Sequence, residues 1–281
     1  MQRFPRIFLG AIAALPLRVL HALGAALGWA LYGISPTYRG QLRANLAQAG
    51  YADSRTRRAA IAAAGQMLAE LPAMWFRPHN EVAALVREVV GEGAALAARA
   101  QGRPLLFLTP HMGCFEVTAQ YAARQLPITV IYRPPHIAWL EPLMLEGRSR
   151  PGMRLVPADV TGVREVFLAL KRNEAVGFLP DQVPGEGEGE WADFFGRPAY
   201  TMTLAARLAE RPNIACFLAY GERLPRGRGY RIVLRPLPDK LAGETATRRI
   251  NRAIEALVRE RPGQYLWSYN RYKTPRGAKP A

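Results

Sequence analysis

The sequence predicts an α/β fold, a layered central mixed sheet flanked by helices, with an N-terminal hydrophobic helix that associates with a membrane. Three observations support this class. First, 281 residues with a hydrophobic fraction of 49% and a charged fraction of 21% can bury a large core, which excludes a disordered chain. Second, short apolar runs alternate with longer helical patterns after residue 100. Third, an almost wholly apolar stretch lies near the N-terminus.

The apolar stretch runs from Ile7 to Ile34 and is interrupted by Pro16, Arg18 and His21. Neither of its longer uninterrupted pieces reaches the roughly 20 apolar residues that a helix needs to span a bilayer. We therefore expect residues 1–35 to form a membrane anchor that either spans the bilayer or lies in its interface. A buried helical hairpin that breaks at Pro16 and a cleaved secretory signal are the two alternatives.

Residues 36–281 are expected to form one domain, because no linker or internal repeat divides them. The expected strands are Leu105–Thr109, Ile128–Tyr132, Ala175–Leu179, Ile214–Tyr220 and Tyr230–Arg235. The expected helices lie within Tyr38–Met74 and at Glu92–Ala100, Phe115–Arg124, Ala138–Arg148, Val163–Lys171, Thr203–Ala209 and Thr245–Arg259. The acidic, glycine-rich run Gly185–Glu190 is expected to be a flexible loop. Connections of this length place helices on both faces of the sheet.

The charge balance suits an anionic partner. Lys and Arg number 38 against 22 Asp and Glu, a net charge of +16, and all but four of the basic residues are arginines. Nucleic acid, an anionic membrane surface and an acidic or phosphorylated carrier all match this balance. A GC-rich genome is an alternative source of the arginine bias. The sequence has no recognisable nucleic-acid motif and no basic patch interleaved with aromatic residues, so we expect no nucleic-acid partner.

The counts of cysteine and histidine argue against a metal centre. Two cysteines and four histidines leave little material for a metal site, and no zinc-ligand spacing occurs. A ligand set could be assembled from His111, Glu116 and either His79 or His136, but no known metal-ligand spacing supports it. Cys114 is more readily explained as a packed core residue than as a nucleophile. We expect no metal and no cofactor.

The most informative segment is the one that follows the first expected strand. There Leu105–Thr109 leads into a loop that contains His111, and functional sites of open α/β sheets form beyond the carboxyl ends of strands. His111 and Glu116 would lie about 500° apart on one continuous helix, so they share a site only if His111 precedes the helix. A turn at Gly113 would then bring Glu116 back to one ring nitrogen. That contact would fix the tautomer and leave the other nitrogen as a base. The alternative is a polar histidine at a strand end with an unrelated helix glutamate.

Further blocks follow one another in order along nearly the whole chain. They are Arg39 to Arg43 with Asn45-Leu46, His111 to Glu116, Ile131 to Pro134 with Gly147 to Arg150, Gly177 to Gln182 with Phe194 to Gly196, and Gln264 to Trp267 with Arg271 to Lys273. Together these blocks resemble those of the late (lauroyl and myristoyl) acyltransferases of lipid A biosynthesis, within the lysophospholipid-acyltransferase-like superfamily.

The resemblance implies transfer of a fatty acyl chain from acyl carrier protein to a hydroxyl of a phosphorylated lipid A precursor. His111 would be the general base and Glu116 would orient it. Arg133 or Arg148 would stabilise the oxyanion or grip phosphate, and Asp181 would position an arginine or the acceptor sugar. The partners would be acyl carrier protein, a phosphorylated glycolipid and the inner membrane, with the catalytic domain on the cytoplasmic face. No cofactor is implied.

Each of these residues also has a plain structural explanation. Arg133 beside two prolines suits a solvated loop, Arg148 suits a helix C-terminus, and Asp181 suits a turn. Arg271 and Lys273 suit a basic tail near the membrane. Two other functions stay open as well, a phospholipid or other glycolipid acyltransferase of the same superfamily and a non-enzymatic basic membrane-binding protein.

Overall fold

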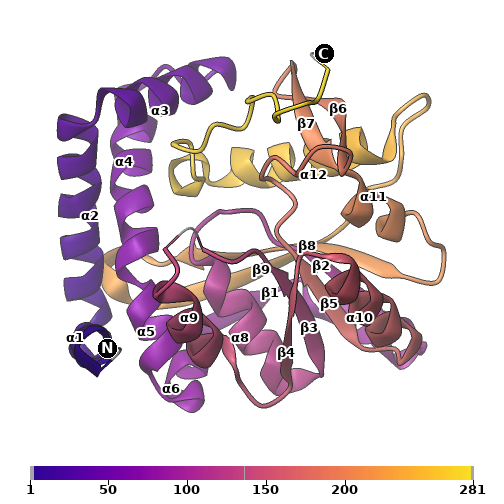
Figure 1. The fold of residues 1–281 in the computed structure, drawn as a ribbon, viewed down its shortest axis with the longest axis horizontal. Coiled ribbons are helices and arrows are strands. Elements are labelled where there is room, and N and C mark those ends of the chain that lie inside the picture. The colour runs from indigo at the N-terminus through magenta and orange to yellow at the C-terminus, as the bar shows by residue number, and fades with distance from the viewer. Residues whose placement is uncertain (1–2, 136, 280–281) are drawn as a thin grey trace.

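The structure is a computed structural model, and it describes residues 3–135 and 137–279. Its centre is a seven-stranded sheet with the strand order β1-β9-β8-β2-β5-β3-β4 (Figure 1). Neighbouring strands are parallel except β8 and β9, which are antiparallel. The seven strands are β1 (Val86–Val90), β2 (Leu105–Leu108), β3 (Ile128–Tyr132), β4 (Met153–Pro157), β5 (Ala175–Phe178), β8 (Ala215–Arg223) and β9 (Tyr230–Pro236). The predicted α/β class is confirmed.

Helices cover both faces of the sheet, as the alternation of apolar runs predicts. Alternate residues of β2 supply two cores, Leu105 and Phe107 on one face and Leu106 and Leu108 on the other. The first face packs against α7 (Glu92–Ala100) and α8 (Phe115–Gln125), and also receives residues of α5 (Leu71–Phe76), α6 (His79–Ala84) and α9 (Leu140–Arg148). The second face packs against α10 (Val160–Lys171), α11 (Thr203–Ala209) and α12 (Ala246–Glu260).

The N-terminal helices lie at one edge of the molecule (Figure 1). They are α1 (Arg3–Ala14), α2 (Leu17–Ile34), α3 (Pro36–Gln48) and α4 (Ser54–Ala69), and the break between α1 and α2 falls at Pro16. Helix α2 lies along α4, where Gly24 and Gly28 allow close backbone approach; a Cβ at Gly28 would clash with the carbonyl of Ile61. The opposite side of α2 is exposed. Helix α2 is therefore half packed on the domain and half free.

Several segments differ from the prediction, and among them α6 lies outside every predicted helix. Strands β1 and β4 lie at the two edges of the sheet, where the charged residues Arg87, Glu88 and Arg154 interrupt the apolar pattern that marks a strand. An additional antiparallel hairpin forms from β6 (Gly189–Phe194) and β7 (Arg197–Met202). The prediction of a loop over Gly185–Glu190 is therefore wrong for its last two residues, which belong to β6. Glu190 is held there because its carboxylate accepts a hydrogen bond from Thr247 at the start of α12.

Candidate active site

The candidate site lies at the carboxyl ends of three adjacent parallel strands. Strand β5 lies between β2 and β3 in the sheet, so the segments after all three strands meet at one edge. His111 follows β2, Asp181 follows β5 and Arg133 follows β3. The sheet topology thus brings together residues that are separated by up to 70 positions in the chain.

Asp181 holds His111 at two points. The backbone N–H of His111 donates to Asp181 Oδ2 at 2.8 Å, and the ring Nδ1–H donates to Asp181 Oδ1 at 2.8 Å. The proton on Nδ1 is assigned from this network, because a carboxylate only accepts. The other ring nitrogen, Nε2, is then the acceptor, and Gln182 Nε2 lies 3.2 Å from it. Nε2 of His111 is therefore the unprotonated ring nitrogen, and its electron pair faces the amide of Gln182.

Asp181 is buried yet kept ionised. Its burial alone would raise the pKa of the carboxyl, but the electrostatic interaction with His111, the two hydrogen bonds from that residue and the charge of Arg271 hold this pKa below the ordinary value of 3.8. Arg271 is itself buried, and it donates to the carbonyl of Tyr200 and to the hydroxyl of Thr201. The interpretation of Arg271 as a basic tail is therefore wrong, because its guanidinium is built into the interior behind Asp181.

Glu116 does not reach His111 in this structure. It lies in the first turn of α8, and both of its carboxylate oxygens accept hydrogen bonds from Arg148 at the end of α9. The contact expected between Glu116 and a ring nitrogen is therefore wrong. The physical reason is that a guanidinium fork satisfies both oxygens, whereas Nδ1 of His111 is already bound to Asp181. Arg148 is thus a partner of a buried carboxylate, and it is more than a charge at a helix end.

The loop that carries His111 is tied to the rest of the chain through its backbone. Gly113 has a φ of +58°, a conformation that favours glycine, and its N–H donates to the carbonyl of Gln264 at 2.9 Å. The N–H of Cys114 donates to Gly221 on β8, and the carbonyl of His111 accepts from Leu266. The C-terminal segment therefore fixes the turn that places His111 before α8.

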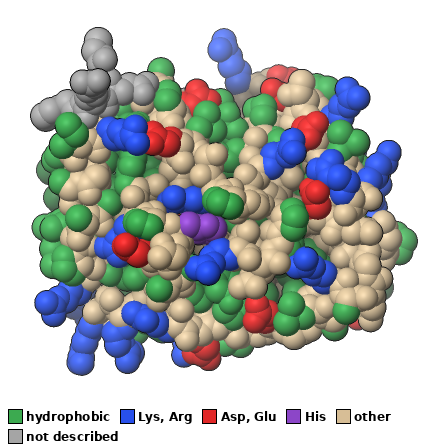
Figure 2. Space-filling model, turned by 90° about the horizontal axis from the view of Figure 1, so that it is seen from below, with side chains coloured by type: hydrophobic (Ala, Val, Ile, Leu, Met, Phe, Trp, Pro, Cys, Tyr) green, Lys and Arg blue, Asp and Glu red, His purple; other side chains and the backbone are tan. Residues whose placement is uncertain are grey.

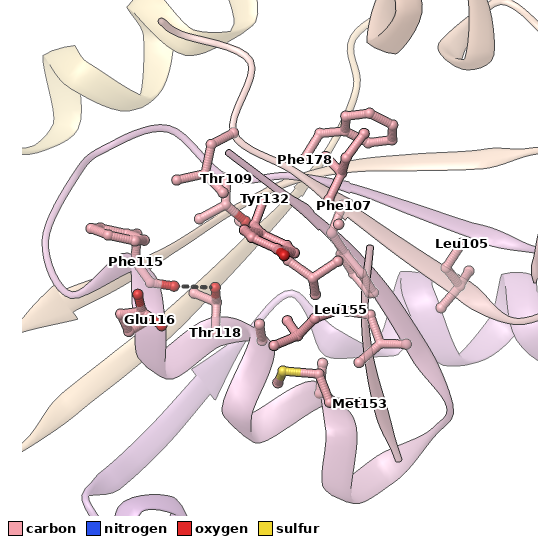
Figure 3. A pocket seen from close by; sticks show the side chains of 18 of the residues that line it. Leu105, Phe107, Thr109, Phe115, Glu116, Thr118, Tyr132, Met153, Leu155 and Phe178 are labelled. Atoms are coloured by element: carbon pink, nitrogen blue, oxygen red, sulfur yellow. Dashed lines mark hydrogen bonds between the residues drawn. The ribbon is translucent and has the colours of Figure 1, made fainter. Parts of the chain in front are cut away.

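A cavity of about 480 Å³ opens beside this site. Figure 3 shows Glu116 and Thr118 on one side of it and Leu105 on the opposite side, with Phe107 and Leu155 among the residues between them. Most of its wall is apolar, and it comes from β2, β3, β4 and β9 and from α7 and α8. Its polar lining includes the site residues, namely His111, Glu116, Arg133, Arg148 and Gln182.

The other candidate residues from the sequence lie in different surroundings. Arg133 lines the cavity, but it is half exposed and pairs with the equally exposed Glu188 at 2.9 Å. Cys114 is buried, and burial raises the pKa of its thiol, so it packs as a core residue. His79 Nε2 lies 2.7 Å from the backbone carbonyl of Gln120, and His136 is outside the described residues. The sequence analysis gave no role to Gln182, although its place next to Asp181 after a strand was a signal.

Fold and site together define a class of protein, an α/β enzyme with a histidine–aspartate pair at the carboxyl edge of its sheet and an adjoining apolar cavity. The sequence profile of the family described as bacterial lipid A biosynthesis acyltransferase matches residues 4–274. The chain belongs to this family and is an acyltransferase.

Curated relatives agree with this assignment. The chain is similar to the lipid A biosynthesis lauroyltransferase of Escherichia coli (strain K12), with 28% identity over 75% of this chain and 69% of that protein. It is also similar to the palmitoleoyltransferase of the same strain, with 27% identity over 75% and 69%. An acyltransferase of lipid A biosynthesis from Haemophilus influenzae shares 26% identity over 64% of this chain and 57% of that protein.

Proposed function

We propose that this enzyme transfers a fatty acyl chain from an acyl carrier protein thioester to a hydroxyl of a phosphorylated lipid A precursor. The observation that carries the proposal is the placement of His111, whose unprotonated Nε2 lies at the wall of a largely apolar cavity with only the amide of Gln182 bonded to it among the described residues. A volume of about 480 Å³ falls within the range of cavities that hold small ligands. An acyl chain is the part of the substrates that such a wall would receive.

In the proposed reaction His111 acts as general base. Nε2 takes the proton of the acceptor hydroxyl while the hydroxyl oxygen attacks the thioester carbonyl. The new carbon–oxygen bond forms as the carbon–sulfur bond breaks, and the proton passes to the departing thiolate of the carrier. Gln182 must turn aside or share Nε2 for the hydroxyl to reach it. Asp181 stabilises the imidazolium that forms, which is the role first expected of Glu116.

Arg148 and Glu116 take a second part in the proposal. Glu116 fixes the guanidinium of Arg148 at the cavity wall with hydrogen bonds of 2.9 and 3.0 Å from Nε. There Arg148 is placed to stabilise the developing oxyanion or to bind a phosphate of the acceptor. Arg133 is the exposed candidate for phosphate binding, because its contact with Glu188 lies at the surface and is readily exchanged.

We propose that residues 1–35 anchor the catalytic domain, residues 36–281, to the cytoplasmic face of the inner membrane. By length and composition α2 is able to cross a bilayer, but a third of it is buried in the protein. Its exposed side carries Leu23, Leu27 and Trp29, and Ile7 and Phe8 are exposed on α1. Figure 2 shows hydrophobic side chains along the left edge of the molecule, on the side where Figure 1 places α2. Because α2 keeps its other side on α4, an interfacial position fits better than a spanning one.

The deciding experiment supplies purified protein with an acyl carrier protein thioester and one of two acceptors, a tetra-acyl lipid A precursor or lysophosphatidic acid. We expect turnover on the first, and a loss of roughly 10²–10⁴-fold in His111→Ala. Arg164→Ala is the matched control, because Arg164 is exposed on α10 outside the cavity wall. Turnover on lysophosphatidic acid alone would contradict the lipid A assignment. Wild-type rates in His111→Ala would contradict the role of His111 as general base.

A further inference from the structure

A second cavity lies on the N-terminal side of the molecule, apart from the candidate active site. Its volume is about 680 Å³, and it is an open cavity bordered by α2, α4 and two short 3₁₀ helices, η1 (Pro225–Gly227) and η2 (Pro262–Gln264). One wall consists of small apolar residues of α2 and α4, namely Ala22, Ala25, Ala59, Ala62 and Ala63. The α2 part of this wall, Ala22 and Ala25, borders the exposed side of that helix, since Ala22 is exposed like Leu23 and Leu27. The cavity therefore opens close to the proposed membrane interface.

The other walls of this cavity are strongly basic. Five arginines line it against one acidic residue, Glu260; they are Arg18, Arg55, Arg223, Arg226 and Arg261. Arg18, Arg55 and Arg226 are exposed, and within residues 3–135 and 137–279 none of the three forms an ion pair. Their charges are therefore not neutralised by the protein. In Figure 2, Lys and Arg side chains gather at the lower left corner, next to the hydrophobic edge.

Arg223 adds a buried positive charge to the same cavity wall. Its side chain is 4% exposed, and it pairs with the carboxylate of Glu70, yet its Nη1 has no hydrogen-bond partner among the described residues. A buried guanidinium nitrogen without a partner is costly, so such atoms usually receive an acceptor from outside the protein. Arg223 is one of the residues of the cavity wall, so this wall contains an unsatisfied buried donor beside the exposed arginines.

The loop that bears Arg226 is held in an unusual conformation. Arg226 has a φ of +61°, in the left-handed region that non-glycine residues seldom adopt. The next residue, Gly227, lies against the backbone of α2 at Arg18, where a Cβ would clash with the Arg18 nitrogen. This close approach brings the side chains of two exposed arginines to the same rim. Strain kept at such a position is typical of binding sites.

We propose that this cavity binds the headgroup of an anionic phospholipid. The exposed arginines of the rim would take the phosphate, since a guanidinium donates two parallel hydrogen bonds to it. The alanine wall would take the upper part of the acyl chains, which continue into the bilayer beside α2. The ligand would thus fix the orientation of the protein on the membrane surface, a role separate from the transfer reaction.

The test measures lipid binding directly, so it is readable even if the proposed reaction fails. Full-length protein in a non-ionic detergent is titrated with phosphatidylglycerol or phosphatidylcholine, and bound lipid is counted by native mass spectrometry. We expect Arg18→Ala/Arg226→Ala to weaken phosphatidylglycerol binding by about tenfold or more, because two charged donors are lost. Arg124→Ala/Arg164→Ala removes the same charge from exposed helix positions outside the cavity and should leave binding unchanged.

Three results would overturn the proposal. Equal binding by the two double variants would show that net charge alone attracts the lipid. Equal affinity for phosphatidylcholine would remove the requirement for an anionic headgroup. Displacement of phosphatidylglycerol by inorganic phosphate at the same concentration would identify a free anion as the ligand. Thermal unfolding of both variants confirms that they are folded, so that each result bears on the cavity itself.

Discussion

Two arginine–carboxylate pairs lie on either side of the His111 loop, and they differ in what surrounds them. Arg148 and Glu116 line the cavity of the candidate active site, where the arginine is 17% exposed. Arg223 and Glu70 are 4% and 1% exposed, and Glu70 also contacts His21 and the hydroxyl of Tyr230. The chemistry of the two pairs is the same, but only the first pair is able to meet a substrate. The comparison teaches that access, rather than pairing, separates a functional arginine from a structural one.

Removal of one partner of the buried pair, Glu70 and Arg223, should cause the largest loss of stability. Glu70→Ala leaves Arg223 charged and unpaired in the interior, and such a change costs about 3–5 kcal/mol of unfolding free energy. Arg223 also donates to the carbonyl of Gly113, so the His111 loop should loosen as well. Denaturant unfolding in detergent measures the loss, with Glu81→Gln on the surface of α6 as the control. A variant as stable as the wild type would show that the pair is not structural.

The pH dependence of stability sharpens the same point. Burial would raise the pKa of Glu70, but the charge of Arg223 and hydrogen bonds from Arg223 and His21 lower it from 4.5 to about 2. The folded state thus favours the ionised carboxylate, so its contribution is complete above pH 4.5 and is lost as the pH falls from 4.5 toward 2. It amounts to about 3 kcal/mol. Unfolding measured across this range should show a smaller loss in Glu70→Gln than in the wild type; parallel curves would contradict this.

The pair at the cavity should affect rate more than stability. Glu116→Gln keeps the shape of the side chain but removes the charge that fixes Arg148, and misplacement of one catalytic group costs roughly 100-fold in rate. We expect kcat to fall while the melting temperature changes little. Steady-state kinetics with the acyl carrier thioester provides the measurement. A fall in melting temperature as large as that of Glu70→Ala would show that the pair of Glu116 and Arg148 also serves mainly to stabilise the fold.

The smallest change tests whether geometry or charge matters at Arg148. Arg148→Lys keeps a positive charge but loses the fork that binds both oxygens of Glu116. We expect a loss of roughly tenfold in kcat/KM, which corresponds to about 1.4 kcal/mol of transition-state stabilisation. A rate near that of the wild type would show that Arg148 acts only as a charge at a helix C-terminus. Removing such a charge changes the free energy of unfolding by about 0.3–1 kcal/mol.

The sequence predicts the elements of this fold well where their patterns are local. Helix α7 has the expected bounds, and the break at Pro16 is where the proline places it. The candidate site residue His111 was predicted from its position after a strand and Asp181 from the family resemblance, and the strands that precede them are neighbours in the sheet. The exchange of partners between Glu116 and Asp181 was not predictable, because α9, which carries Arg148, is placed by packing against α5. Glu70 and Arg223 are 153 residues apart, and neither shows a local signal of the other.

The tie between the His111 loop and the end of the chain has a consequence for biosynthesis. The N–H of Gly113 donates to Gln264, and the carbonyl of His111 accepts from Leu266, so the loop is complete only after residues 264–266 have left the ribosome. Helix α2, in contrast, is made well before them, and chains fold from the N-terminus as they emerge. If α2 is the membrane anchor, a nascent chain would reach the membrane while His111, the proposed general base, was still unplaced. Membrane association would therefore precede completion of the His111 loop, so an incomplete chain at the membrane would not transfer acyl groups.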